Sequence, residues 1–290
     1  MKEKYISGRN NEFIVGICKL KQKKHRNKTG LFYVEGTKLS EEALKSGLNI
    51  RHIIVVGDAH RASREYDSAS ILSDSASILS AGRPLSAGRP GVRPLQNTEI
   101  VIVTREVYKK ITDEEAFEGI MCVIEKPDKH IILPYKKPVI ILSSVRDPGN
   151  VGAIIRTADA ICGADMILSE DCADIYSGKT QRAAMGAVFR QNIKISGDIK
   201  QDIENLRENG YNILAAHLDK DSRNIDEIEF NAKTAVVFGN EGGGLDDEIV
   251  KTCDGKIIIP MNPSGESLNV SVAAGIVLWE MRKIREEREE

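Results

Sequence analysis

The stretch from Ile257 to Glu280 is the part of this 290-residue chain that most restricts its fold. It begins with a β-branched run typical of a buried strand, which Pro260 ends. A polar loop with Pro263 and Gly265 follows and leads into an apolar segment of helical length. A strand, a loop and a helix in this order indicate an α/β protein, in which ligands bind where loops leave the carboxyl ends of strands.

Two other loops of unusual composition also follow apolar runs. Residues 143–150 come after the strand-like run Val139–Leu142, and residues 239–245 come after Thr234–Phe238. Parallel strands of one sheet carry their carboxyl ends at the same edge. Three such loops in one domain therefore predict a single composite pocket.

Each polar residue in these loops has a plain structural alternative. Ser267 or Asn269 would cap the helix that follows by accepting a hydrogen bond from an N–H of its first turn. Glu241 stands among four glycines in residues 239–244, which permit positive φ and close approach of a ligand, although it would also serve as a simple turn acid. The glycines lack the G-x-G-x-x-G order, which disfavours an ordinary dinucleotide domain.

A helix is expected to begin at Val151, with Asn150 as its N-cap. Its apolar residues share one face, and at 100° per residue Arg156 points almost opposite to them. A solvent-exposed surface arginine is one interpretation. Phosphate contact is the other, because a helix that leaves the first strand of an α/β domain is a usual place for it.

Charge is distributed unevenly, although the net charge is only −2. Residues 1–30 contain nine Lys or Arg and two Glu, an excess of seven positive charges. Such a region steers a polyanion through its phosphates, and residues 19–28 are its densest part. A solvated helix face explains the same charge equally well.

Two segments outline the domains. Residues 67–96 contain two copies of DSASILS and two of AGRP, which indicates a local duplication within a loop. Residues 127–138 are rich in proline and lysine and are typical of a linker. We therefore expect a small α/β domain over 1–126 and a second α/β domain over 139–290.

The five cysteines are scattered, without a Cys-x-x-Cys pair or a nearby His at ligand spacing. Neither a metal site nor a disulfide framework is expected. No apolar run reaches the roughly 20 residues of a membrane span, and the first residues lack the apolar core of a signal peptide. The expected location is the cytoplasm, with no membrane association.

The three loops together resemble the three motifs of the SpoU/TrmH family of RNA 2′-O-ribose methyltransferases. They read NVGAIIRTADA from Asn150, VFGNEG from Val237, and IPM followed by SLNVS from Ile259 to Ser271. The resemblance covers roughly residues 138–285, and residues 32–36 are similar to the L30e-like substrate-binding domain often fused to it. It implies a SPOUT α/β domain with a deep trefoil knot, S-adenosylmethionine as cofactor and a homodimer, with no metal.

The resemblance also implies site residues. Gly239, Ile259 and Leu268 match the positions that contact the cofactor. The polar active-site positions of the family are matched by Asn150, Arg156, Glu241, Ser267 and Asn269. In-line methyl transfer requires alignment of the ribose oxygen and removal of its proton. Arg156 matches the proposed base, but a guanidinium has a pKa above ~12, so binding the neighbouring phosphate is an alternative role.

Ribosomal RNA is the expected substrate, and transfer RNA is the alternative. An RNA-binding protein of this fold without activity is a further possibility, which the presence of all five polar site residues disfavours. A Rossmann-type methyltransferase would place its glycine loop after the first strand, whereas here that loop comes late in the chain. The helix from Val270 to Met281 is apolar on nearly every side, so core burial or a partner subunit must cover it.

Overall fold

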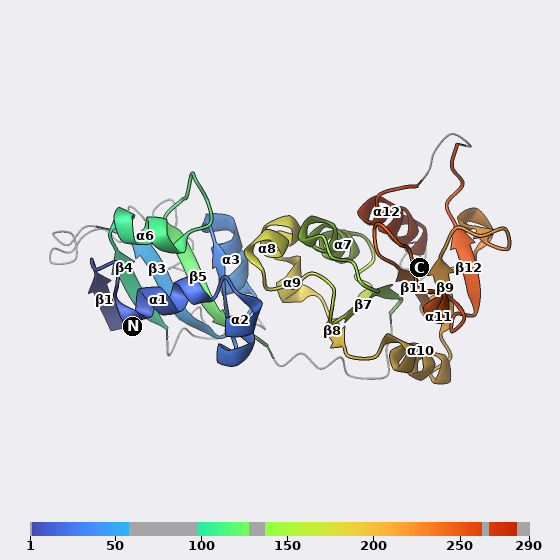
Figure 1. Ribbon diagram of the computed structural model, residues 1–290, viewed down its shortest axis with the longest axis horizontal. Coiled ribbons are helices and arrows are strands. Elements are labelled where there is room, and N and C mark those ends of the chain that lie inside the picture. The colour runs from blue at the N-terminus through green and yellow to red at the C-terminus, as the bar shows by residue number, and fades with distance from the viewer. Residues whose placement is uncertain (1, 58–97, 128–136, 263–266, 283–290) are drawn as a thin grey trace, which may run out of the picture. The chain divides into compact units, whose positions relative to one another are not determined.

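The computed structural model describes residues 2–57, 98–127, 137–262 and 267–282 (Figure 1). The expected insertion at 67–96 lies outside the described residues, as does most of the expected linker at 127–138. The chain divides into two compact units. The first comprises Met1–Asp128 and Tyr176–Phe189, and the second comprises Lys129–Ile175 and Arg190–Glu290.

The first unit is built on a mixed sheet with the strand order β1-β4-β3-β5-β2. β1, β4 and β3 are parallel, whereas β5 runs antiparallel to both β3 and β2. The strands are β1 Lys2–Ile6, β2 Leu31–Glu35, β3 Ile50–Val56, β4 Glu99–Val103 and β5 Ile120–Glu125. The helices are α1 Glu12–Lys19, α2 Lys23–Thr29, α3 Thr37–Lys45, α6 Arg105–Ile111, α8 Gly178–Ala184 and α9 Ala187–Arg190.

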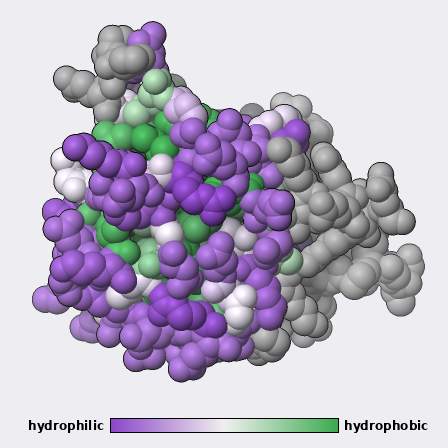
Figure 2. Space-filling view, turned by 90° about the vertical axis from the view of Figure 1, so that its right-hand side faces the viewer, coloured by the Kyte–Doolittle hydropathy of each residue, from purple (hydrophilic) through white to green (hydrophobic). Residues whose placement is uncertain are grey.

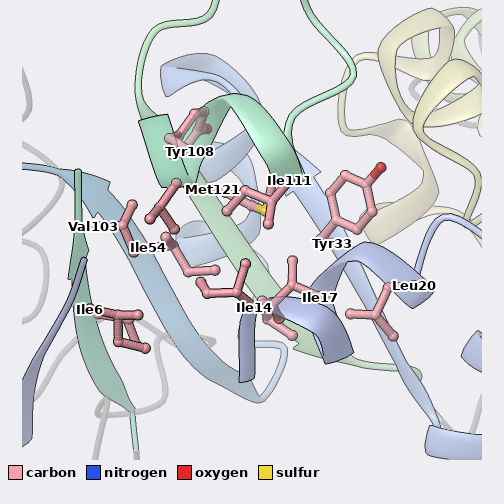
Figure 3. Packing of buried hydrophobic residues seen from close by; sticks show 13 residues of the cluster. Ile6, Ile14, Ile17, Leu20, Tyr33, Ile54, Val103, Tyr108, Ile111 and Met121 are labelled. Carbon is pink, nitrogen blue, oxygen red and sulfur yellow. The ribbon is translucent and has the colours of Figure 1, made fainter. Parts of the chain in front are cut away.

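Side chains that alternate along β2 pack into two cores, because successive residues of a strand point to opposite faces of the sheet. Tyr33 joins a cluster with residues of α1 and α6, where Ile14 and Ile111 pack against Met121 of β5 (Figure 3). Phe32 joins the other cluster, and its ring lies 4.7 Å from that of Tyr176. Both faces of this sheet are therefore covered by helices.

Much of the densest part of the basic region, residues 19–28, forms a short helix of its own, α2, which follows α1. Arg26 is buried and donates from Nη1 to the carbonyls of Leu20, at 2.7 Å, and Lys21, at 2.8 Å. Those carbonyls lie just past the end of α1, where backbone acceptors lack helical partners. Arg26 thus holds α2 against the end of α1, which removes it from the basic residues expected to contact RNA.

The second unit contains a seven-stranded sheet with the order β10-β12-β9-β11-β6-β7-β8, and every pairing in it is parallel. β6 and β11 are buried along their whole length, as expected of strands covered on both faces. Its strands are β6 Val139–Leu142, β7 Asp165–Ser169, β8 Ile193–Ser196, β9 Asn212–Ala216, β10 Arg223–Asn224, β11 Thr234–Phe238 and β12 Gly255–Ile258.

The helices of this unit are α7 Pro148–Ile161, α10 Ile199–Glu208, α11 Asp247–Val250, α12 Val270–Met281 and the 3₁₀ turn Ile225–Glu227. α12 packs against α7. The expected start of α7 at Val151 was wrong, because Asp147 is the N-cap and accepts from the N–H of Asn150 at 3.0 Å. Pro148 suits the first helical position, since that position needs no N–H donor. Asn269 caps α12, as one of the two interpretations of that residue predicted.

The observed architecture confirms the α/β class in both units, and the trefoil knot stays a prediction. In the part of the chain that is described, no helix combines the length and the apolar character needed to cross a membrane. The face at the β12 end of the second unit is mostly hydrophilic, with apolar residues in separate areas (Figure 2).

Candidate active site

The candidate site lies at the carboxyl edge of the parallel sheet in the second unit. β11 pairs with β6 on one side and with β9 on the other, and β9 pairs with β12. The loops after β6, β11 and β12 therefore leave the sheet at one edge, as the sequence predicted. These are the same three loops that carry the family motifs.

Asn150, Glu241 and Asn269 form a continuous hydrogen-bonded chain across these loops. The Nδ2 of Asn150 donates to Oε1 of Glu241 at 3.0 Å. The Nδ2 of Asn269 donates to Oδ1 of Asn150 at 3.1 Å. At the far end, Oδ1 of Asn269 accepts from the backbone N–H of Ser271 at 2.9 Å and from its hydroxyl at 2.6 Å. Three of the five polar site residues that the resemblance implies are thus brought together.

The direction of every bond in this chain is determined by its two ends. A backbone N–H can only donate, so the oxygen of Asn269 faces Ser271 and its NH₂ faces Asn150. A carboxylate without a proton can only accept, so the NH₂ of Asn150 faces Glu241. Both amides are therefore oriented without ambiguity, and the helix cap of α12 is coupled to the carboxylate in the glycine loop.

Partial burial pushes the pKa of Glu241 upward, but hydrogen bonds outweigh it and the pKa ends below its ordinary value. The Asn150 amide is the strongest of these donors, followed by backbone N–H groups that include that of Asp147, whose nitrogen lies 3.4 Å from Oε1. Glu241 is consequently ionised at neutral pH. A carboxylate with a lowered pKa is a weak proton acceptor but a good hydrogen-bond acceptor for the amide beside it.

The glycine loop folds back tightly on itself. A Cβ at Gly239 would lie 2.2 Å from the backbone carbon and oxygen of Gly244 and 2.4 Å from the nitrogen of Leu245. Gly244 has a φ of +70°, in the left-handed region that favours glycine. The lack of a side chain at Gly239 is therefore required by the loop's own backbone, whatever else binds there.

The remaining expected residues lie around this edge without joining the hydrogen-bonded chain. Arg156 is exposed on α7, away from the buried face of that helix, and makes no hydrogen bond or ion pair within the described residues. Ile259 directly follows β12 and is half-buried. Ser267 and Leu268 are exposed just before the cap of α12, and Leu268 retains 37% of its surface.

Other residues at the site were missed by the sequence analysis. Ser144, after β6, has a φ of +58°, and its hydroxyl donates to Oδ2 of Asp171 at 2.6 Å. Asp171 also lies 3.6 Å from Nη2 of the exposed Arg146. Hydrogen bonds from Ser144 and Ser169 lower the pKa of Asp171, so this carboxylate stays charged. The only sequence pattern that could have pointed to Ser144 and Asp171 is that polar residues directly follow an apolar run at each of these two places.

Leu218 is a further feature of the same edge. It lies two residues past the end of β9 and retains 66% of its surface, which is unusual for leucine. The neighbouring backbone is held in place because the N–H of His217 donates to the carbonyl of Ile257 in β12 at 3.1 Å. Leu218 and Ile259 thus present apolar side chains just past strand ends, and Leu268 adds an exposed one before the cap of α12. Apolar side chains of this kind are typical of the sites that bind a flat heterocycle.

Comparison with known proteins agrees with this arrangement. Residues 137–279 match the SpoU rRNA Methylase family, and residues 11–122 match the MRM3-like substrate binding domain. The 23S rRNA (guanosine(2553)-2′-O)-methyltransferase RlmP of Bacillus subtilis is 29% identical over 96% of this chain and 99% of its own length. The tRNA (guanosine(18)-2′-O)-methyltransferase of Aquifex aeolicus is 33% identical over 63% of this chain and 82% of its own.

A solved structure resembles the whole chain. The AdoMet-bound rRNA methyltransferase from Sinorhizobium meliloti superposes with a TM-score of 0.77 at 29% identity, covering 97% of this chain and 98% of its own. The three motif loops of this chain lie at the sheet edge where Asn150, Glu241 and Asn269 meet. The match of residues 137–279, the match of residues 11–122 and the relative from Aquifex aeolicus, 33% identical over 82% of its own length, together show that this chain belongs to the SpoU rRNA methylase family.

Proposed function

We propose that this protein is an S-adenosylmethionine-dependent 2′-O-ribose methyltransferase that acts on ribosomal RNA. The observation that carries the proposal is the chain of hydrogen bonds from Ser271 through Asn269 and Asn150 to Glu241, which unites all three motif loops. Ribosomal RNA is favoured because the relative from Bacillus subtilis, named for 23S rRNA, matches both units over nearly its full length.

The residues at the sheet edge suit the cofactor. Leu218, Leu268 and Ile259 offer apolar surface for an adenine ring, and the strand ends beside them offer backbone N–H and C=O groups. Bound there, S-adenosylmethionine supplies an electrophilic methyl group. Gly239 maintains the tight glycine loop beside this surface, so its contribution to cofactor binding is through loop shape.

The side chains of this protein then have distinct tasks. Asn150 and Asn269 are held in fixed orientations and align the ribose against the methyl group. Arg156 projects from α7 as an exposed cation and binds the phosphate next to the target ribose, and the proton of the 2′-hydroxyl leaves to water as its oxygen takes up the methyl group. Ser267, exposed beside Leu268, is positioned to accept a hydrogen bond from RNA or cofactor.

The test is transfer of a labelled methyl group to ribosomal RNA and, separately, to transfer RNA, followed by mapping of the modified nucleotide. We expect incorporation into ribosomal RNA at a ribose 2′-hydroxyl. Arg156→Ala should lower the single-turnover rate by about 100-fold or more while leaving cofactor affinity by calorimetry nearly unchanged. Arg223→Ala, at an exposed arginine of β10, is the matched control. Incorporation into transfer RNA alone would establish the second substrate, and none into either would reject the function.

A further inference from the structure

Asn240, the residue before Glu241, closes the glycine loop with both its backbone and its side chain. Its N–H donates to the carbonyl of Gly244 at 2.9 Å and its carbonyl accepts from the N–H of Gly244 at the same distance. Its Oδ1 accepts from the N–H of Gly242 at 2.9 Å and from that of Gly243 at 3.4 Å. Glu241 is enclosed by these bonds, so its backbone has little freedom.

The same side chain also crosses to the loop after β6. The Nδ2 of Asn240 donates to the backbone carbonyl of Ser144 at 2.8 Å. A carbonyl only accepts and a backbone N–H only donates, so this amide has a single orientation that satisfies both sides. The asparagine amide carries its acceptor and its donor on two separate atoms, so Oδ1 bonds to the glycine loop while Nδ2 reaches the loop after β6.

Ser144 is held in the conformation that this bond needs. Its φ of +58° lies in the left-handed region, which costs a residue other than glycine about 1 kcal/mol or more. Its N–H donates to Oγ of Ser169 at 2.9 Å and its hydroxyl donates to Oδ2 of Asp171. Strain of this kind persists only where neighbouring groups determine the backbone, and it concentrates at functional sites.

These contacts lie between the two loops that must meet for the site to form. Phe238 at the end of β11 pairs with Leu142 at the end of β6, and the N–H of Ser143 donates to the carbonyl of Phe238 at 2.8 Å. Beyond this point the strands no longer hold the loops together. The bond from Asn240 to Ser144 is the next connection, and Glu241 follows it directly.

We propose that Asn240 is a positioning residue for methyl transfer, which holds Glu241 against Asn150 by linking the glycine loop to the carbonyl of Ser144. This inference rests on the function proposed above. Asn240 acts only through Glu241, and it is not assigned any contact with RNA or cofactor. Its loss should therefore reduce the rate of transfer rather than the affinity for either substrate.

Two neutral variants test this role. Asn240→Ala removes both sets of side-chain bonds. Asn240→Ser keeps an oxygen that can accept from the N–H of Gly242, as serine does in short turns, but cannot reach Ser144. Both should lower the single-turnover rate by about 10-fold or more, with KM for S-adenosylmethionine and for RNA within about twofold of the parent. Asn224→Ala is the control, since its Nδ2 donates only locally to Glu227.

A second readout does not depend on activity. Titration of Glu241 by ¹³C NMR, assigned with Glu241→Gln, should give a pKa below the ordinary value in the parent and a higher pKa in folded Asn240→Ser. An unchanged pKa in that variant, or an unchanged transfer rate, would overturn the positioning role. If the parent methylated no RNA, the proposed function would fail, and the titration would still decide whether Asn240 holds the carboxylate.

Discussion

Asn150 and Glu241 are 91 residues apart in the sequence and are joined by a hydrogen bond of 3.0 Å from Nδ2 to Oε1. Asn150 lies in the first turn of α7, whereas Glu241 lies in a loop that ends another strand. Asn269 donates to Oδ1 of the same Asn150 amide. The Asn150 amide therefore cannot rotate without breaking its bonds to both Glu241 and Asn269. The side chain of Asn150 thus bonds to residues of both other motif loops.

Replacing Asn150 with aspartate should place a second carboxylate opposite Glu241. The parent pKa of Glu241 is lowered, so its stabilising contribution is present at neutral pH and is lost as the pH falls through that pKa. In Asn150→Asp the contact becomes repulsive at neutral pH, by on the order of 1 kcal/mol after screening by solvent. Protonation relieves the repulsion, so the loss of stability should shrink on acidification from pH 7 to pH 4. Thermal unfolding across that range measures it.

The matched control is Asn150→Ala, which removes the same donor without adding a charge. Its loss of stability at neutral pH should be smaller than that of Asn150→Asp. Equal stability of the two variants at pH 7 would show that the side chain at position 150 does not face Glu241 in solution.

The sequence predicted the central strands of the second unit well, because their apolar runs are continuous. β6 and β11 have the predicted limits, and both are buried along their whole length. The edge strands β8 and β10 were missed. Each is short and has exposed residues, so the apolar pattern that identifies a strand is weak there.

Only part of the site could be predicted, because local sequence patterns contain some of its contacts and not others. Loops after parallel strands must share an edge, so local patterns predicted that the three loops meet, and the family resemblance named Asn150, Glu241 and Asn269 within them. The link from Asn240 to Ser144 depends on the register of β11 against β6, which no local pattern contains. Arg26 was counted as a ligand for a polyanion because charge alone does not reveal burial.

Gly239→Ala should destabilise the second unit by about 2 kcal/mol or more, because the new Cβ would lie 2.2 Å from the backbone of Gly244. A backbone atom within a tight loop cannot move aside as the end of a side chain can. Gly243→Ala is the control for stability, since a Cβ there meets nothing within 4 Å. Chemical denaturation of both variants measures the difference. Equal midpoints would mean that the loop is more open in solution.

Lys24 and Lys28 of α2 are exposed and should contact RNA phosphates. Lys21 is excluded from this set, since it pairs with Asp113 at 2.8 Å. Changing Lys24 and Lys28 to glutamine should reduce the slope of log affinity against log salt by about 1.5, which corresponds to two lost phosphate contacts. Filter binding between 50 and 200 mM salt, concentrations over which such slopes are resolved, measures this. The control changes Lys200 and Lys251, which both pair with Glu248. An equal slope for parent and variant would show that Lys24 and Lys28 do not contact RNA and that α2 is only a solvated helix face.

Homodimerisation through α12 is the last expectation, and we propose it from the apolar residues that this helix leaves in solvent. Val272 and Trp279 retain 50% and 52% of their surface, although Ala274, Leu278 and other residues of α12 are fully buried. The helix therefore serves the core of its own unit and still has apolar surface for a partner. Sedimentation should give about twice the 32.0 kDa mass of the chain, and Trp279→Asp should give monomers.

In such a dimer Arg156 would be offered to the cofactor site of the partner subunit, because it is exposed on α7, the helix against which α12 packs. Mixing inactive Arg156→Ala chains with inactive Glu241→Ala chains then tests whether one site draws on two subunits. Hybrid dimers would contain one intact site, so random mixing should restore about a quarter of the parent activity. Arg156→Ala mixed with a chain that carries both substitutions should restore none. Full activity of a Trp279→Asp monomer would exclude both the shared site and the need for a dimer.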